Sequence, residues 1–156
     1  MRERADTFLA QSSIAIVGVS RDTKKTANFI YRKLRQEGYR VFAVNPNTSM
    51  VEGDPCYPNL QAIPEKPGAV MIVTRPALTV PVVRECAELG ISHVWMHEGL
   101  DMKGSSVSKE SVAYCQAHDI QVIPGGCPMM YCKHRDFGHR VIRWIKNLSG
   151  SLPADI

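Results

Sequence analysis

Short apolar segments alternate along this chain with longer stretches of helical periodicity. The clearest apolar segments are residues 13–18, 40–44 and 69–73, and each ends at a glycine or at a polar turn. Continuous apolar runs of this length are typical of strands buried on both faces of a sheet. Further strands are predicted at 93–96 and 120–123. Residues 48–67 hold four prolines, so they are expected to form one short edge strand and otherwise loop.

Helical segments are predicted between and after these strands, over 26–38, about 78–89, about 106–118 and about 135–148. Thr26 is the expected N-cap of the first helix, and Gly38 and Gly90 are expected to end the first two. Pro81 suits the second helix only within its first turn, because a proline farther in removes a backbone hydrogen bond.

Five or six strands alternating with helices imply a parallel sheet covered on both faces. Crossover connections between parallel strands are right-handed almost without exception. We therefore expect a three-layer α/β, Rossmann-like fold with a doubly wound, mainly parallel sheet. The length of 156 residues fits one domain over 1–156, with a core over about 12–127 followed by the C-terminal amphipathic helix.

Composition narrows the class of protein. The chain is 44% apolar and 22% charged, its N-terminus is charged with no apolar run behind it, and no apolar stretch is long enough to span a membrane. Its five cysteines are scattered and odd in number, as expected for reduced thiols in a cytoplasmic protein. The net charge is only +4, but residues 21–40 hold seven basic and two acidic side chains. This asymmetry favours a local anion site over a surface for nucleic acid, and no membrane partner is expected.

In an open parallel sheet the ligand binds beyond the carboxyl ends of the strands, where the strand order reverses. This rule selects five loops, at 18–25, 45–47, 74–76, 97–99 and 125–127. The loop 18–25 has only the first glycine of a dinucleotide fingerprint, since Ser20 stands where the second is required. Its cations could hold phosphate by charge, or they could be ordinary solvated side chains.

Asn45 follows the second strand, where an NAD enzyme usually carries an acidic residue that binds the ribose 2′-hydroxyl. The asparagine, with Arg21, Lys24 and Lys25 expected nearby, favours coenzyme A or NADP over NAD. The same residues, Asn45-Pro46-Asn47, also suit a simple tight turn.

Several motifs, taken in order and spacing, resemble the small stand-alone CoA-binding proteins with a Rossmann-like fold. They are also similar to the CoA-binding N-terminal domain of the succinyl-CoA synthetase alpha subunit. The resemblance extends from about Ser12 to Cys127. The motifs are IVGVS at 16–20, GYRVFAVNP at 38–46, ELGI at 88–91, Trp95, EG at 98–99 and CP at 127–128.

The resemblance implies a coenzyme A site built from these loops. It implies that the phosphates of the ADP half are wrapped by Gly18, Val19, Ser20 and Arg21. It implies that the adenosine lies beside Asn45 and Pro46, that the other edge of the nucleotide follows Thr74, Arg75 and Pro76, and that Glu98 and Gly99 border the site. The contribution of Lys24 and Lys25 is inferred from their charge alone.

No histidine has the context of the phosphorylated histidine of the synthetase, and 156 residues are expected to leave no room for that enzyme's second domain. The leading hypothesis is therefore a non-catalytic or regulatory module that binds coenzyme A or an acyl-CoA. The alternatives are an NADP-binding, oxidoreductase-like protein and a CoA-binding subunit of a larger acyl-CoA ligase. A homodimer or a ligase partner subunit is possible.

Cys127, in the loop after the last strand, could approach the pantetheine arm and exchange with the CoA thiol if it is exposed and its pKa is lowered. It could equally be a small buried hydrophobic residue. A zinc site formed with Cys132, His134 and His139 is disfavoured by the spacing, and no metal is expected. The basic side chains of 135–148 are read as a solvated helix face, with a nucleic-acid stripe or a docking face for a partner subunit as alternatives.

Overall fold

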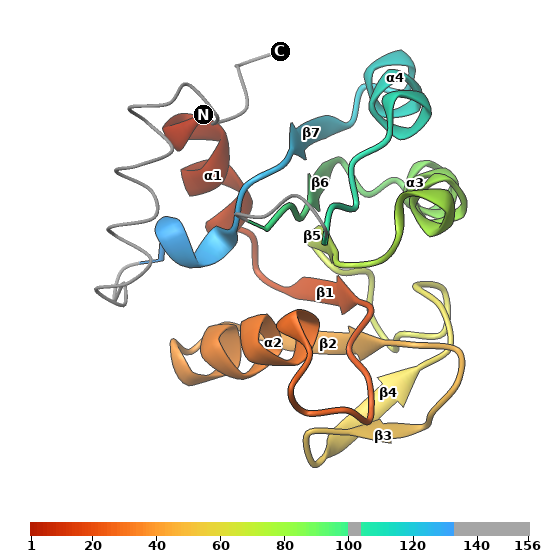
Figure 1. Ribbon diagram of the computed structural model, residues 1–156. Coiled ribbons are helices and arrows are strands. Elements are labelled where there is room, and N and C mark those ends of the chain that lie inside the picture. Colours follow the sequence, from red (N-terminus) through yellow and green to blue (C-terminus); the bar gives the residue numbers. More distant parts are fainter. Residues whose placement is uncertain (100–103, 133–156) are drawn as a thin grey trace.

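The computed structural model of the chain describes residues 1–99 and 104–132. A seven-stranded sheet forms its centre, with the strand order β3-β4-β2-β1-β5-β6-β7 (Figure 1). The strands are β1 (Ile14–Val17), β2 (Val41–Val44), β3 (Met50–Val51), β4 (Asp54–Tyr57), β5 (Ala69–Ile72), β6 (His93–Met96) and β7 (Gln121–Pro124). All neighbouring pairs are parallel except β3 with β4. The expected mainly parallel, doubly wound sheet is confirmed.

β1 lies in the middle of the sheet and pairs with β2 on one side and with β5 on the other. Its four residues are all buried, but they face two different cores. Ile14 and Ile16 pack into the core on one face, and Ala15 and Val17 pack into the core on the other. This double burial is why the segment is apolar throughout instead of alternating.

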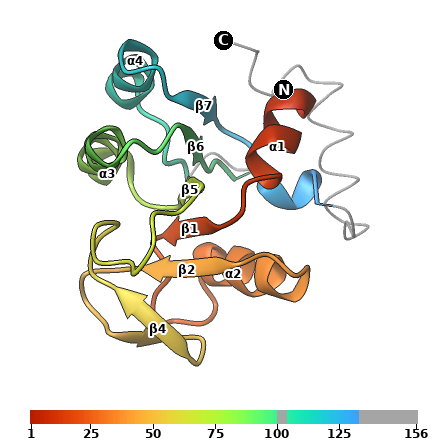
Figure 2. The ribbon, with the colours of Figure 1, turned by 180° about the vertical axis from the view of Figure 1, so that it is seen from behind.

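Helices cover both faces of the sheet and complete three layers. α1 (Arg2–Leu9), α2 (Thr26–Gln36) and the short 3-10 helix η1 (Pro128–Met130) lie on one face. α3 (Pro76–Leu89) and α4 (Lys109–Ala117) lie on the other, as the reverse view also shows (Figure 2). Within the described residues no helix combines the length and the apolar character needed to cross a bilayer.

The segment 48–67 contains two short strands instead of the single edge strand expected. β3 and β4 form a hairpin whose two-residue turn is Glu52-Gly53. Both turn residues have positive φ, 51° and 78°. Such turns usually carry Asn-Gly or Asp-Gly, so the Glu-Gly pair gives no clear hairpin signal in the sequence.

Several predicted helix boundaries are wrong by a few residues. Thr26 is the first residue of α2, and Lys25 is its N-cap. α3 starts at Pro76, which places Pro81 inside the helix and not in its first turn. α4 starts after Ser108, whose hydroxyl accepts the Ser111 N–H at 3.0 Å. The helix predicted at 135–148 lies outside the described residues.

α1 was not expected, because its eight residues are mostly polar. Ala5, Phe8 and Leu9 nevertheless share one buried side. The Phe8 ring packs edge-on against Trp95 of β6, with ring centroids 5.4 Å apart. The long-range contact with the sheet, more than the local sequence, accounts for this helix.

Candidate functional site

An open cleft lies at the carboxyl ends of β1 and β5, where the strand order reverses. Its volume is about 420 Å³. The residues that line it come from the loop after β1, the start of α2, the segment that joins β5 to α3, the first turn of α3, and the loop after β6. They are Gly18, Ser20, Lys25, Thr26, Ala27, Val73, Thr74, Arg75, Pro76, Leu78, Gly104 and Ser105. This is the position at which doubly wound folds bind their ligands.

Gly18 allows the two sides of the cleft to approach each other closely. Its φ of +111° lies in a region that L side chains rarely adopt. A Cβ at this position would overlap the backbone carbonyl oxygen of Val73, the residue directly after β5. Glycine is therefore required here both by backbone conformation and by space.

Two helices begin at the cleft, and their N-terminal residues contribute to its lining. Lys25 is the N-cap of α2 and Arg75 is the N-cap of α3, and neither caps its helix with its own side chain. A helix N-terminus presents backbone N–H groups and a partial positive charge, which favour a bound anion. The cationic side chains of Lys25 and Arg75 add to this preference. The cleft is therefore suited to a phosphorylated ligand.

The loop after β1 is held in place by two asparagine side chains. Asn28 of α2 is fully buried, accepts the Ser20 N–H at 3.0 Å and donates to the Ser20 carbonyl oxygen at 2.7 Å. Asn45, after β2, donates to the Val19 carbonyl oxygen at 3.0 Å. The loop is thus fixed by hydrogen bonds from both flanking elements, in the absence of the glycines of a dinucleotide fingerprint.

The basic segment 21–40 divides into paired and unpaired charges. Four of its cations form ion pairs: Arg32 with Glu52, Lys33 with Glu37, Arg35 with Asp54, and Arg40 with Glu65. Within residues 1–99 and 104–132 no ion pair involves Arg21, Lys24 or Lys25. These three exposed side chains of the first loop are the cations that remain for an anionic ligand.

Six of the predicted site residues line the cleft: Gly18, Ser20, Lys25, Thr74, Arg75 and Pro76. The others lie outside its lining. The Val19 side chain is fully buried in the core, so that only its backbone can face a ligand. Arg21 and Lys24 are exposed elsewhere on the same loop. Asn45 and Pro46 are in the turn after β2, where Asn45 Oδ1 accepts the Asn47 N–H at 2.9 Å.

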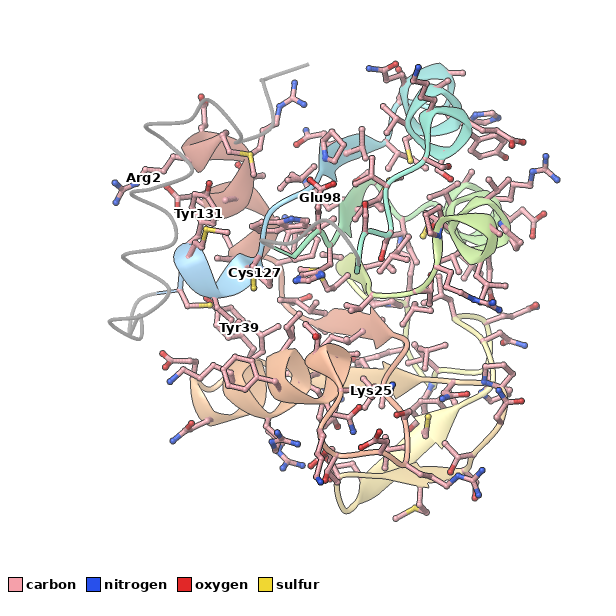
Figure 3. All side chains as sticks on the ribbon, in the orientation of Figure 1. Arg2, Lys25, Tyr39, Glu98, Cys127 and Tyr131 are labelled. Carbon is pink, nitrogen blue, oxygen red and sulfur yellow. The ribbon has the colours of Figure 1, made fainter. Side chains whose placement is uncertain are left out.

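Glu98, Gly99 and Cys127 lie in the loops after β6 and β7, outside the lining of the cleft. Figure 3 labels Glu98 and Cys127 together with Lys25. The Glu98 N–H donates to the Gly126 carbonyl oxygen at 3.2 Å, which joins the two loops. Cys127 is half-buried and packs against the core on the α1 and α2 face.

The apolar and small residues of the cleft were not among those expected from the sequence. Leu78, in the first turn of α3, is 47% exposed although it is apolar. Gly104 and Ser105 lie at the cleft because the neighbouring Ser106 is anchored there. The buried hydroxyl of Ser106 accepts the Thr74 N–H at 3.0 Å. The Ser106 carbonyl oxygen accepts from the Thr79 hydroxyl at 2.7 Å. Leu78 could have been predicted, because it lies in the first turn of a helix that begins at the expected anion site. No local sequence pattern predicts that Gly104 and Ser105 line the cleft.

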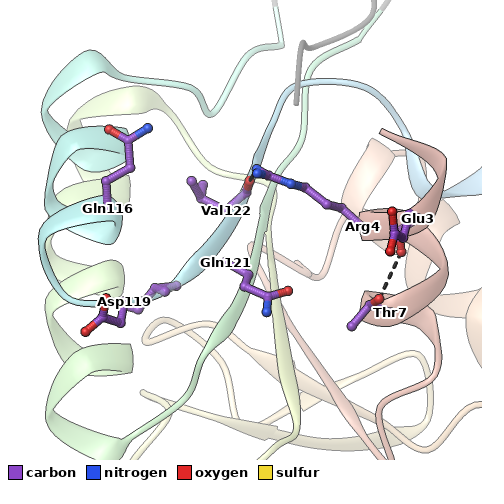
Figure 4. Close-up of a pocket in the computed structure, with 8 residues that line it drawn as sticks. Glu3, Arg4, Thr7, Gln116, Asp119, Gln121 and Val122 are labelled. Atoms are coloured by element: carbon purple, nitrogen blue, oxygen red, sulfur yellow. Dashed lines mark hydrogen bonds between the residues drawn. The ribbon is translucent and has the colours of Figure 1, made fainter. Parts of the chain in front are cut away.

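A second hollow, of about 570 Å³, lies beside β7 at the edge of the sheet (Figure 4). It is formed by α1, the end of α4 and the first residues of β7, so it is away from the carboxyl ends of the strands. Its cation, Arg4, donates to the Val122 carbonyl oxygen at 3.3 Å, and acidic Glu3 and Asp119 also line it. This composition does not favour an anionic ligand.

Of the four residues weighed as a zinc site, Cys127 and Cys132 are described by the structure, whereas His134 and His139 lie outside the described residues. Among the residues that are described, no group of three or more His, Cys, Asp or Glu side chains is placed to hold a metal ion.

The fold is similar to that of several small archaeal proteins of known structure. A hypothetical protein from Pyrococcus horikoshii OT3 matches with a TM-score of 0.76 and 26% identity, over 84% of this chain and 89% of that one. A conserved hypothetical protein from Pyrococcus furiosus matches with a TM-score of 0.64 and 27% identity, over 74% of this chain and 93% of that one.

Curated relatives are acetate–CoA ligases of the ADP-forming kind. Ligase I of Archaeoglobus fulgidus is 28% identical over 120 residues, which cover 73% of this chain and 17% of the ligase. Ligase II subunit alpha of Pyrococcus furiosus is 25% identical over 163 aligned positions, which cover 97% of this chain and 36% of the subunit. The chain thus spans only a minor part of these relatives' length. The family model described as the CoA binding domain matches residues 12–133, close to the extent of the resemblance seen in the motifs. This chain belongs to the CoA binding domain family.

Proposed function

We propose that this chain binds coenzyme A or an acyl-CoA through its ADP half, in the cleft between β1 and β5. The observation that carries the proposal is the pair of helix N-termini at the cleft, with Lys25 and Arg75 as their N-cap residues. Together they offer two cations and backbone donors to a diphosphate. The backbone donors come mainly from α2, because α3 begins with Pro76, which has no N–H, and the Leu78 N–H donates to the Arg75 carbonyl oxygen. Membership of the CoA binding domain family supports the choice of ligand.

We assign each part of the ligand to a group of residues from their positions around the cleft. The diphosphate would lie against the backbone of 18–20 and the starts of α2 and α3. The exposed Leu78 offers an apolar surface beside it. Asn45 and Pro46 would lie beside the adenosine, and the exposed Arg21 and Lys24 would face the ribose 3′-phosphate. Glu98, Gly99 and Cys127 would border the pantetheine arm.

We assign no chemistry of its own to this domain. The relatives are much longer ligases, of which the matched segment is a minor part. Its role would be to hold coenzyme A, with a regulatory, protective or carrier output in the cytoplasm. A CoA-binding subunit that acts with a ligase partner is the second candidate, favoured by the match that covers nearly the whole of this chain.

Calorimetric titration with coenzyme A, NADP and NAD tests the proposal. We expect saturable binding of coenzyme A and much weaker binding of either dinucleotide. Arg75→Ala should weaken coenzyme A binding about tenfold, because a charge-assisted contact to phosphate is lost. Arg84→Ala is the matched control, since Arg84 is an exposed cation of the same helix outside the cleft. Binding of NADP but not coenzyme A would overturn the proposal.

The ligase-subunit candidate predicts that the native protein co-purifies with a larger partner. Migration of the natively purified protein alone, as a monomer or homodimer, would count against it and leave the binding proposal standing. Mass spectrometry of any ligand retained through purification would identify the acyl group.

A further inference from the structure

Glu52 occupies an unusual position for a glutamate. It is the first residue of the two-residue turn between β3 and β4, with a φ of 51°. Asparagine, aspartate and glycine are the residues that favour this conformation. A longer side chain brings no advantage to the turn itself. The choice of glutamate therefore points to a role for its carboxylate elsewhere.

The carboxylate of Glu52 is turned toward α2 and is almost completely buried, with 8% of the side chain exposed. Its Oε1 atom accepts a hydrogen bond from Asn28 Nδ2 at 2.8 Å and another from Arg32 Nη1 at 2.7 Å. A carboxylate can only accept hydrogen bonds, so both donors are held facing it.

Both partners of Glu52 also hold the loop after β1. Asn28 makes two hydrogen bonds with the peptide groups of Ser20, one to the N–H and one to the carbonyl oxygen. Arg32 Nη1 donates to the Thr23 carbonyl oxygen at 2.9 Å. One buried carboxylate thus joins two supports of the loop whose backbone lines the cleft.

Asp54, two residues farther along the same hairpin, makes a different set of contacts. Its Oδ2 atom accepts from the Tyr31 hydroxyl at 2.7 Å and from Arg35 Nη1 at 2.6 Å. The hydrogen bonds of Tyr31 and Arg35 go to the hairpin, whereas those of Asn28 and Arg32 also reach the loop. Asp54 therefore attaches the hairpin to α2 through side chains that do not hold the loop, whereas Glu52 attaches it through two side chains that do.

We propose that Glu52 is a positioning residue for the anion-binding loop: through Asn28 and Arg32 it fixes the peptide groups of Ser20 and Thr23. The consequence for ligand affinity rests on the proposed function. An anion-binding loop gains affinity from being held in its binding conformation before the ligand arrives. Glu52 supplies this order from a strand hairpin that does not line the cleft.

The sharpest test is Glu52→Asn. Asparagine suits the turn better than glutamate, but its shorter side chain cannot span to Asn28 and Arg32. We expect the variant to fold, because the better turn residue offsets part of the stability that is lost with the two hydrogen bonds to the Glu52 carboxylate. Its affinity for coenzyme A should fall about tenfold, because buried donors lose their acceptor and the loop loosens. Amide hydrogen exchange at Ser20 should become faster. Glu52→Gln, which keeps the length and one acceptor, should give a smaller loss.

Asp54→Asn is the matched control on the same hairpin. It should lower the Tm and leave coenzyme A affinity within about twofold, since it perturbs the attachment of the hairpin and not the loop. An unchanged affinity and unchanged Ser20 exchange in Glu52→Asn would overturn the proposal. So would equal losses of affinity in Glu52→Asn and Asp54→Asn. If the unchanged protein binds no coenzyme A, the proposed function fails, and exchange at Ser20 alone then decides whether Glu52 positions the loop.

Discussion

Asn45 Nδ2 donates a hydrogen bond to the Val19 carbonyl oxygen at 3.0 Å, and so joins the turn after β2 to the loop after β1. Position 45 is where many dinucleotide enzymes carry an acidic residue. Here a donor is needed, because the partner is a carbonyl oxygen. Asn45, whose amide favours coenzyme A or NADP over NAD, therefore also connects two loops at the carboxyl ends of the strands.

Asn45→Asp should lower both the free energy of unfolding and the affinity for coenzyme A. The substitution replaces a donor with a carboxylate that repels the Val19 carbonyl oxygen, at a cost of about 1–3 kcal/mol. The free energy of unfolding from urea denaturation measures the first effect, and calorimetry with coenzyme A measures the second. Asn47→Asp, in the exposed part of the same turn, is the control and should change neither. A variant at position 45 as stable as this control would show that the bond contributes little.

Gly18→Ala should destabilise the protein by about 3 kcal/mol or more. Alanine would suffer both the positive φ and the overlap of its Cβ with the Val73 carbonyl oxygen. Gly38→Ala is the matched control, since Gly38 has a φ of +88° but no atom within 4 Å of the point where an alanine Cβ would lie. Its loss should be about 1–2 kcal/mol, from backbone conformation alone. Equal losses of unfolding free energy for the two variants in urea denaturation would mean that the close approach of Gly18 to the Val73 carbonyl oxygen contributes little to the cost.

Replacing Arg21, Lys24 and Lys25 together with alanine should weaken coenzyme A more than dephospho-coenzyme A. These cations of the first loop are exposed and, among the described residues, form no ion pair, so their charge is available to the 3′-phosphate. The difference between the two ligands should shrink as salt is added. Arg40→Ala is the control, because Arg40 directly precedes β2 and so lies at the amino ends of the strands, away from the cleft. Equal losses for the two ligands would contradict a role in reading the 3′-phosphate.

Stability should decline in acid partly through Asp54. The hydrogen bond from the Tyr31 hydroxyl, aided by Arg35, lowers the pKa of this carboxyl group in the folded protein. Folding therefore favours the ionised form. The contribution is complete above the unfolded-state pKa of about 4 and is lost as the pH falls through the lower folded-state pKa.

Asp54→Asn removes that contribution, so its Tm should fall less steeply than that of the unchanged protein as the pH is lowered below about 4. The effect should stay below about 1 kcal/mol, because the side chain is 39% exposed and water screens the interaction. Thermal denaturation across this pH range measures it. Parallel acid profiles for the two proteins would contradict the assignment.

The three layers of the fold could be predicted from the sequence because a strand that is buried on both faces is apolar at every position, and this pattern is visible in a short stretch of sequence. β1 is apolar at every position because Ile14 and Ala15 face different cores. The same reasoning located the carboxyl ends of the strands, and with them Gly18, Ser20 and Arg75.

What sequence analysis missed depends on contacts between distant segments. α1 is stabilised by Phe8 on Trp95, which are 87 positions apart. The β3–β4 turn carries Glu52 instead of the usual asparagine or aspartate, and the carboxylate of Glu52 accepts a hydrogen bond from Asn28 of α2. Ser105 reaches the cleft through the hydrogen bond of its neighbour Ser106 to Thr74. None of these pairings leaves a periodic signal in the chain.

The pairing of β1 with β5 has a consequence for how the protein folds. Ile14 and Ala69 are register partners, so the two walls of the cleft are separated by 55 positions of chain. A nascent chain that ends before β5 has the loop after β1 but no opposite wall, and the cleft forms only with the long-range contacts that are slowest to form. A ligand that needs both walls binds the native state and not the unfolded one, and it stabilises the fold in proportion to the logarithm of its concentration. Coenzyme A availability would then govern the lifetime of the folded protein as well as its occupancy.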